Sequence, residues 1–192
     1  MDELTKEGFS RLEYLIIFFS ILYGYVTISF INHLAELLKK HTQLKFHFVP
    51  LAWIFLFFGL LFSSWYSRWG MIDISLKGFH HFIVLTLPVL IMTVISSLLS
   101  PPIPKQGETI DMYGFFAKNR VMFFVSFSTY SSFELISGWI YDTIQEIRFC
   151  VLLFYTVLFV LGLLSKNKKY QTLIAAISAI VFILVFSILE KI

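Results

Sequence analysis

A carboxylate and a guanidinium lie in one apolar stretch of this sequence, where charged groups are costly. Glu134 falls inside the segment Val121–Ile140, and Arg120 comes directly before that segment. A charged side chain at the centre of a membrane helix costs about 2.5–3.5 kcal/mol on insertion scales, so such groups normally face protein or water. Because successive residues of a helix are about 100° apart, Arg120, Ser131 and Glu134 fall on one face.

This face predicts a polar pathway across a membrane. Arg120 and Glu134 are 14 residues apart, about 21 Å at 1.5 Å per residue, so they mark opposite ends of the face and do not pair. We expect Arg120 to set the charge preference at one mouth and Glu134 to bind or relay a cation near the other. Tyr130 and Ser131 would line the route. The alternative is structural, with Arg120 as an interfacial anchor and Glu134 as a hydrogen-bond partner of another helix.

A second polar stripe follows the helix expected at residues 12–38. Its members include Tyr25, Ser29, Asn32 and Glu36, which lie within about 60° of one another around the helix. Together with the first face, it predicts a pathway along the first and fourth helices. His33 and Glu36 have the i, i+3 spacing that can place two metal ligands together. A metal needs more convergent ligands than these, so we predict a solvated helix end, no metal and no cofactor.

The composition identifies the elements that position these residues as membrane helices. Of the 192 residues, 58% are hydrophobic and only 14% are charged, against roughly 25% charged in soluble domains, which excludes an ordinary water-soluble fold. A spanning helix needs about 20 mostly apolar residues. The sequence therefore predicts an all-α polytopic membrane helix bundle, a single transmembrane domain over residues 1–192 with no soluble domain. Its six transmembrane helices are expected at about 12–38, 49–67, 79–100, 114–140, 147–165 and 171–189.

Lys and Arg predict the orientation of this bundle. With six spans both termini share a side, and the 15 Lys and Arg residues divide into six on that side and nine on the other. Cytoplasmic loops carry the excess of positive charge, so we expect a multi-pass protein of the cell inner membrane with both termini outside. The basic loops Lys39–Lys45 and Lys166–Lys169 would face the cytoplasm and could recruit a protein or anionic lipid. Charges in such short loops do not predict direct nucleic-acid binding.

Enzyme signatures do not appear in the sequence. It contains no H-E-x-x-H, G-x-S-x-G or C-x-x-C motif, so an enzyme is not favoured. Our leading hypothesis is a homo-oligomeric channel or pore-like protein, because six helices are few for a pathway within one chain. Two alternatives stay open. One is a membrane-embedded accessory or regulatory protein that acts through a partner, and the other is an intramembrane lipid-modifying enzyme that uses Glu134 or the His33–Glu36 pair as acid and base.

Short motifs spread along most of the chain carry a resemblance. They are Leu12–Glu13–Tyr14, Trp53, and Tyr113–Gly114–Phe115–Phe116 running into Asn119–Arg120, with Glu134 and Gly138 beyond. In this pattern the chain resembles short uncharacterised bacterial membrane proteins of six helices. Proteins similar in size and hydropathy are encoded beside antiviral systems, including RNA-targeting CRISPR effectors, and some are thought to depolarise the membrane. The resemblance implies an accessory role in antiviral defence and transfers no catalytic residue.

Overall fold

The computed structural model describes residues 11–69, 79–140 and 146–189, and these fold into helices with one very short strand pair. The described residues form six α-helices, and each coincides with one of the apolar segments of the sequence, with ends that differ by at most three residues. The helices are α1 (Arg11–Lys39), α2 (Phe48–Trp69), α3 (Phe79–Leu98), α4 (Met112–Ile140), α5 (Glu146–Leu164) and α6 (Lys168–Leu189). The predicted all-helical fold is confirmed.

Length and composition qualify three segments of the described helices to cross a membrane. They are Glu13–Lys39 in α1, Phe48–Tyr66 in α2 and Lys168–Val185 in α6, and shorter apolar stretches occupy Phe82–Leu98 in α3 and Phe149–Leu164 in α5. The bilayer core requires about 20 apolar residues of helix, and long α4 carries charged and hydroxyl residues within its length. Both termini fall in residues 1–10 and 190–192, outside the described residues, so their predicted placement is not addressed.

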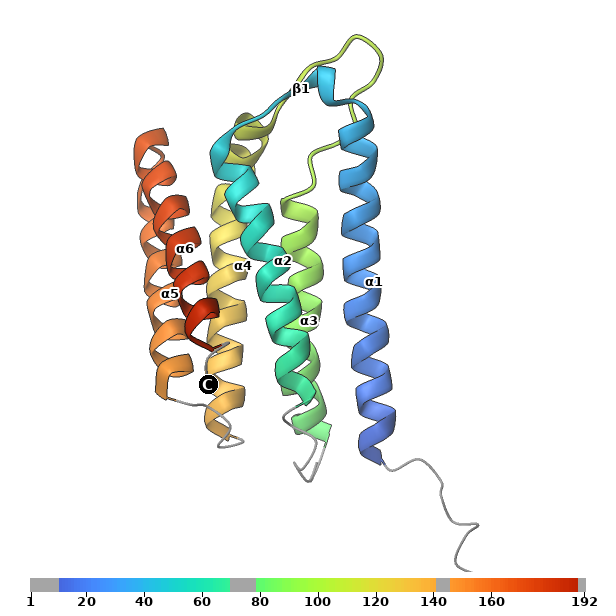
Figure 1. Cartoon of the computed structure of the whole chain (residues 1–192), viewed down its shortest axis with the longest axis vertical. Coiled ribbons are helices and arrows are strands. Elements are labelled where there is room, and N and C mark those ends of the chain that lie inside the picture. Colours follow the sequence, from blue (N-terminus) through green and yellow to red (C-terminus); the bar gives the residue numbers. More distant parts are fainter. Residues whose placement is uncertain (1–10, 70–78, 141–145, 190–192) are drawn as a thin grey trace, which may run out of the picture.

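The helices stand side by side in one bundle, with α4 near its centre (Figure 1). α4 packs against α3 and α5, α2 packs against α6, and α1 packs against α2 and α3. α1 therefore occupies an edge of the bundle, with one face toward its neighbours and the opposite face outward (Figure 1).

The three described connections lie at the same end of the bundle (Figure 1). A 3-10 turn (His41–Gln43) leads into β1 (Leu44–Lys45), which pairs in parallel with β2 (Ile110–Asp111) just before α4. The strand pair was not expected from the sequence. Gly107 has a φ of 84° and lies within a turn closed by the Glu108 N–H and the Lys105 carbonyl at 3.0 Å; glycine tolerates this left-handed conformation.

Local chemistry determines where the helices begin and end at this shared end. α3 ends shortly before Pro101, Pro102 and Pro104. The helix cannot continue through these residues, because proline lacks the N–H that the next turn would need. The Asp111 carboxylate accepts a hydrogen bond from the Tyr113 N–H at 3.0 Å, and Asn167 Oδ1 accepts one from the Lys169 N–H at 2.9 Å. Asp and Asn are preferred N-caps because their oxygens satisfy free N–H groups of the first turn, so α4 and α6 both have capped starts.

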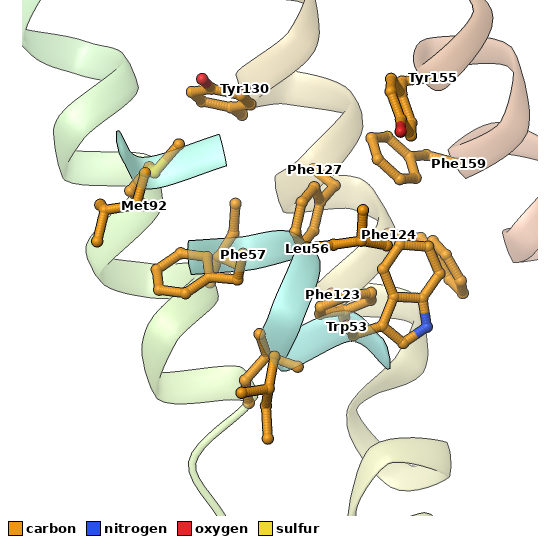
Figure 2. Close-up of a cluster of buried hydrophobic side chains, with 14 of the residues drawn as sticks. Trp53, Leu56, Phe57, Met92, Phe123, Phe124, Phe127, Tyr130, Tyr155 and Phe159 are labelled. Atoms are coloured by element: carbon orange, nitrogen blue, oxygen red, sulfur yellow. The ribbon is translucent and has the colours of Figure 1, made fainter. Parts of the chain in front are cut away.

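A layer of aromatic rings forms the centre of the core (Figure 2). Trp53 of α2 is fully buried, and its ring lies 5.2 Å from Phe123 and 5.6 Å from Phe124, both of α4. Phe127 lies 4.7 Å from Phe123 and 4.8 Å from Phe159 of α5. Edge-to-face and tilted ring pairs at these distances each contribute about 0.5–1.5 kcal/mol beyond their buried area. We call these five residues the aromatic layer; they join α2, α4 and α5.

Candidate functional site

Glu134 lies inside the bundle, and hydroxyl groups from two other helices approach it. Its side chain is only 3% exposed. Ser64 Oγ of α2 donates to Glu134 Oε1 at 3.4 Å, a long and therefore weak hydrogen bond. The Tyr23 hydroxyl of α1 lies 2.6 Å from Ser64 Oγ. Either hydroxyl can donate in this short contact.

Tyr23, Ser64 and Glu134 therefore form a hydrogen-bonded chain across α1, α2 and α4, which we call the Glu134 cluster. Ser137 Oγ donates to the Glu134 backbone carbonyl at 3.1 Å, which adds a hydroxyl bond one turn further along α4. A buried carboxylate in contact with a hydroxyl oxygen can hold a proton or contribute to a cation site, because both groups supply hard oxygen ligands. The cluster links α1 to α4 through Ser64 of α2, and its α1 member is Tyr23, which lies outside the polar stripe predicted for that helix.

Tyr130 and Ser131 also lie on the inner side of α4. Both are buried, and they precede Glu134 by about one helical turn. Tyr130 projects toward α3 and Met92 above the aromatic layer (Figure 2). Ser128 Oγ is buried as well and has no hydrogen-bond partner within the part of the chain that the structure describes. The polar groups of this half of α4 thus face protein, in agreement with the energetic argument from the sequence.

The aromatic layer separates Glu134 from Arg120. Phe123, Phe124 and Phe127 lie between the two charges along α4, and all three are almost completely buried. Their rings meet Trp53 and Phe159 from neighbouring helices (Figure 2). The face that the sequence assigned to a continuous polar route is therefore apolar in its middle third. Within the described chain, the two charged ends of the face are separated by packed rings.

Arg120 caps the C-terminal end of α5. It is 5% exposed, and its Nη1 donates to the Gly162 carbonyl at 3.1 Å and to the Ser165 carbonyl. Gln171 Nε2 of α6 donates to the same two carbonyls, at 2.9 and 2.7 Å. The last carbonyls of a helix have no partner within it and carry partial negative charge. Arg120 and Gln171 satisfy them together, so this clamp ties α4, α5 and α6.

The polar stripe of α1 does not face the Glu134 cluster. Tyr25 is 67% exposed, and Ser29, Asn32 and Glu36 are exposed too. The inner side of α1 is formed instead by Phe19, Tyr23, Val26, Phe30 and Leu37. Tyr23 and Tyr25 are two residues apart, about 200° around a helix, which explains why one points inward and the other outward. The structure therefore brings together Tyr130, Ser131 and Glu134 of α4, keeps Arg120 apart from them, and leaves the predicted site residues of α1 on the outside.

Sequence reasoning missed Tyr23 and Ser64. A signal existed for Tyr23, since it occupies the apolar repeat Phe19, Tyr23, Val26, Phe30 that marks the buried side of α1. Ser64 had none, because serine is common in membrane helices as a packing residue. His33 is also engaged, since its Nε2 lies 2.8 Å from the Pro101 carbonyl. Among the described residues, no group of three or more His, Cys, Asp or Glu side chains is placed to hold a metal.

The loop end of the bundle carries a basic surface. Eight exposed lysines lie there, against three exposed acidic residues near the same end within the described chain. The lysines are Lys39, Lys40, Lys45, Lys105, Lys118, Lys166, Lys168 and Lys169, and the acids are Glu36, Glu108 and Asp111. We call these lysines the basic end. The positive excess makes this end attractive to anionic partners.

His47 occupies a confined position within the basic end. The centroid of its ring lies 4.7 Å from that of Tyr113. Lys168 Nζ lies 4.9 Å from the centroid of the same Tyr113 ring. His47 Nδ1 accepts a hydrogen bond from the Val49 N–H at 3.2 Å, which caps the start of α2. Burial lowers the pKa of His47 below its usual 6.5, and the nearby Lys168 lowers it further, while Asp111 acts in the opposite direction. The neutral imidazole is therefore the form that fits this fold.

Comparisons with protein-family models, with curated proteins and with solved structures find no match for this chain.

Proposed function

We propose that the chain is a subunit of a homo-oligomeric membrane channel in which Glu134 is the cation-binding group. The observation that carries the proposal is the burial of this carboxylate within an apolar bundle, in contact with the Ser64 hydroxyl of α2, which is in turn hydrogen-bonded to the Tyr23 hydroxyl of α1. A carboxylate within a membrane span is energetically costly, and ionisable residues in such positions often belong to ion or proton pathways.

All six helices cross the bilayer in this proposal. Three segments have the length and composition for it, and α3 and α5 are apolar over shorter stretches. α4 fits because Arg120, Ser131 and Glu134 turn inward, whereas Val121, Met122 and Val125 are exposed on its outer side. A helix of this kind can stand in lipid because the groups that are most costly to expose are covered by protein. The basic end would lie in the cytoplasm, as the positive-inside rule requires.

The aromatic layer acts as the closed gate of this channel. Narrow apolar constrictions stop ion flow because water leaves them, and the rings of Trp53, Phe123 and Phe127 fill the space between the Glu134 cluster and Arg120. Conduction then requires these rings to move apart or a route between neighbouring copies. In either case Arg120 stabilises the wall at the basic end, because its guanidinium is already bound to the carbonyls of α5.

Ion flux across reconstituted vesicles tests the proposal. Wild type should conduct monovalent cations or protons, and Glu134→Gln should reduce that flux by at least tenfold while keeping a similar volume. Glu108→Gln is the matched control, since Glu108 is an exposed loop carboxylate whose loss should change little. Size-exclusion profiles of the three proteins would establish that they are equally folded. The proposal is refuted if wild type gives no ion flux under any applied voltage or gradient. It is also refuted if wild type and Glu134→Gln give equal flux.

A second candidate function is favoured by the basic end, namely a membrane accessory that recruits an anionic protein. Exposed lysines at Lys166, Lys168 and Lys169 form a compact positive group where α5 and α6 connect. Replacing all three by Glu should abolish co-purification of that protein after cross-linking in cells, while Lys105→Glu at the opposite part of the loop end should not. Equal recovery of partners by the triple variant and wild type would reject this candidate.

A further inference from the structure

The outer side of α1 has a regular repeat that the bundle does not use. Its residues are spaced by four and three positions in alternation, and every one of them is exposed. They are Ile21, Tyr25, Ile28, Asn32, Ala35 and Lys39, which we call the outer seam. This is the a and d spacing by which two helices pack along their length. Ile21 and Lys39 are 18 positions apart, which is about 27 Å at 1.5 Å per residue, close to the thickness of the bilayer core.

The opposite side of α1 already has its neighbours. Phe19, Tyr23, Val26 and Phe30 are buried, because this side packs against α2 and α3. Figure 1 shows α1 at the edge of the bundle, with no described helix beyond it. The outer seam is therefore not part of the packing of the described chain, although its pattern is as regular as that of the buried side.

Polar groups on the outer seam lie deep in the proposed membrane span. Tyr25 is near the middle of the segment Glu13–Lys39, about 21 Å from Lys39 at 1.5 Å per residue. Asn32 is about 10 Å from the same end. A phenol and an amide directed into hydrocarbon would lose their hydrogen bonds to water, and nothing in the lipid replaces them. A protein partner that offers hydrogen bonds removes this cost.

Gly24 gives an independent indication of close approach. A Cβ added there would meet no atom within 4 Å, so packing within the chain does not require a glycine at this position. Glycine is also less favourable than alanine inside a helix. Gly24 flanks the outer seam one residue before Tyr25, where a small residue allows the backbone of a second membrane helix to come near.

We propose that a second copy of this chain packs in parallel along the outer seam. This inference rests on the proposed function, in which copies assemble, and it names the surface that joins them. A two-fold axis along the membrane normal keeps both copies in the same orientation, so each seam residue meets its own equivalent. The two Asn32 amides then face each other, and an amide both donates and accepts. A single Asn in such a seam also defines the register of the two helices.

Asn32 makes a second copy a better fit to the outer seam than an unrelated helix. A parallel symmetric copy supplies a matching amide at the same height. Lys39 also meets its own equivalent, so the close contact extends from Ile21 to Ala35, and the two ammonium groups at the helix end turn toward water.

Disulfide cross-linking in vesicles at a low protein-to-lipid ratio tests the parallel seam. In a Cys150→Ser background, Ile28→Cys should form a disulfide dimer of twice the chain mass, since a disulfide requires Cα atoms about 4.4–6.8 Å apart. The control is Ile180→Cys on α6, because Ile180 is 58% exposed and Ile28 is 62% exposed. Equal cross-linking of both variants, no cross-linking of Ile28→Cys, or a product with another mass would overturn the proposal.

Asn32 supplies a second measurement that does not depend on added cysteines. Asn32→Leu should weaken dimerisation in lipid about 3- to 20-fold, the range expected for one interhelical hydrogen bond in a membrane. Unchanged dimerisation of Asn32→Leu would count against the paired amides and the parallel register. Flux separates the two proposals. Flux without seam cross-links would overturn the seam alone, and seam cross-links without flux would overturn the channel alone.

Discussion

The Arg120 and Gln171 clamp leads to a prediction about how two substitutions combine. Both side chains donate to the carbonyls of Gly162 and Ser165. In Arg120→Met, Gln171 still satisfies both carbonyls, so the loss is two charge-assisted bonds of about 1.5–3 kcal/mol each. Release of a buried cation returns several kcal/mol of desolvation. We therefore expect Arg120→Met to lower the free energy of unfolding by only about 1–3 kcal/mol.

Gln171→Met should cost less, about 0–1 kcal/mol. It removes two neutral bonds of about 0.5–1.5 kcal/mol each, but it also removes Gln171 Oε1, which is buried with no partner in the described chain. The double variant leaves both carbonyls without a side-chain donor. The Gly162 carbonyl is buried, so leaving it unsatisfied costs about 1–3 kcal/mol, whereas water can reach the half-buried Ser165 carbonyl. The double variant should therefore lose about 1–3 kcal/mol more than the sum of the two single losses.

A double-mutant cycle of unfolding in mixed micelles measures this coupling. Independent sites add to within about 0.3–0.5 kcal/mol, so coupling above that range supports the shared clamp. The control pairs Arg120→Met with Thr93→Val, because the Thr93 hydroxyl bonds within α3 to the Val89 carbonyl and should behave additively. If Arg120→Met and Gln171→Met are also additive, the two donors do not share the α5 carbonyls and the clamp is refuted.

Three further predictions concern packing and pH. A Cβ at Gly162 would lie 2.6 Å from the Phe124 ring. Gly162→Ala should therefore lower the free energy of unfolding by about 1–3 kcal/mol through overpacking. Gly24→Ala has open space and should leave the monomer as stable or up to about 1 kcal/mol more stable; equal losses in both variants would contradict this reasoning. Trp53→Ala removes the centre of the aromatic layer and should cost about 3–5 kcal/mol in equilibrium unfolding, so a loss below 1 kcal/mol would show that the layer is not a packed core. Because the folded state lowers the pKa of His47 from 6.5, its stabilising effect should be complete above pH 6.5 and should decline as the pH falls through that value, since the unfolded chain binds the proton first. A melting-temperature series from pH 8 to 5 should show this decline in wild type and a smaller one in His47→Gln, and identical slopes would exclude His47 as its source.

The sequence alone predicted the helices well, because the information is local. Each helix corresponds to a continuous apolar run, and prolines such as Pro101 and Pro102 end α3 without reference to the rest of the chain. The inward direction of Glu134 was also predictable, since the cost of a carboxylate in lipid holds wherever the neighbouring helices stand. The same argument placed Ser131 on the inner face of α4, and the structure buries it.

Tertiary packing decided the partners of these residues and the orientation of α1. The carbonyls that bind Arg120 lie 42 and 45 residues further along the chain, a distance that no periodic pattern encodes. α1 carries two sides of similar regularity, and only its contacts with α2 and α3 show that Tyr23 joins the Glu134 cluster while Tyr25 faces outward. Periodicity thus determined that α1 and α4 each have a polar face. Which of those faces meet depends on how the helices are arranged around α4, because packing energy depends on neighbours far away in sequence.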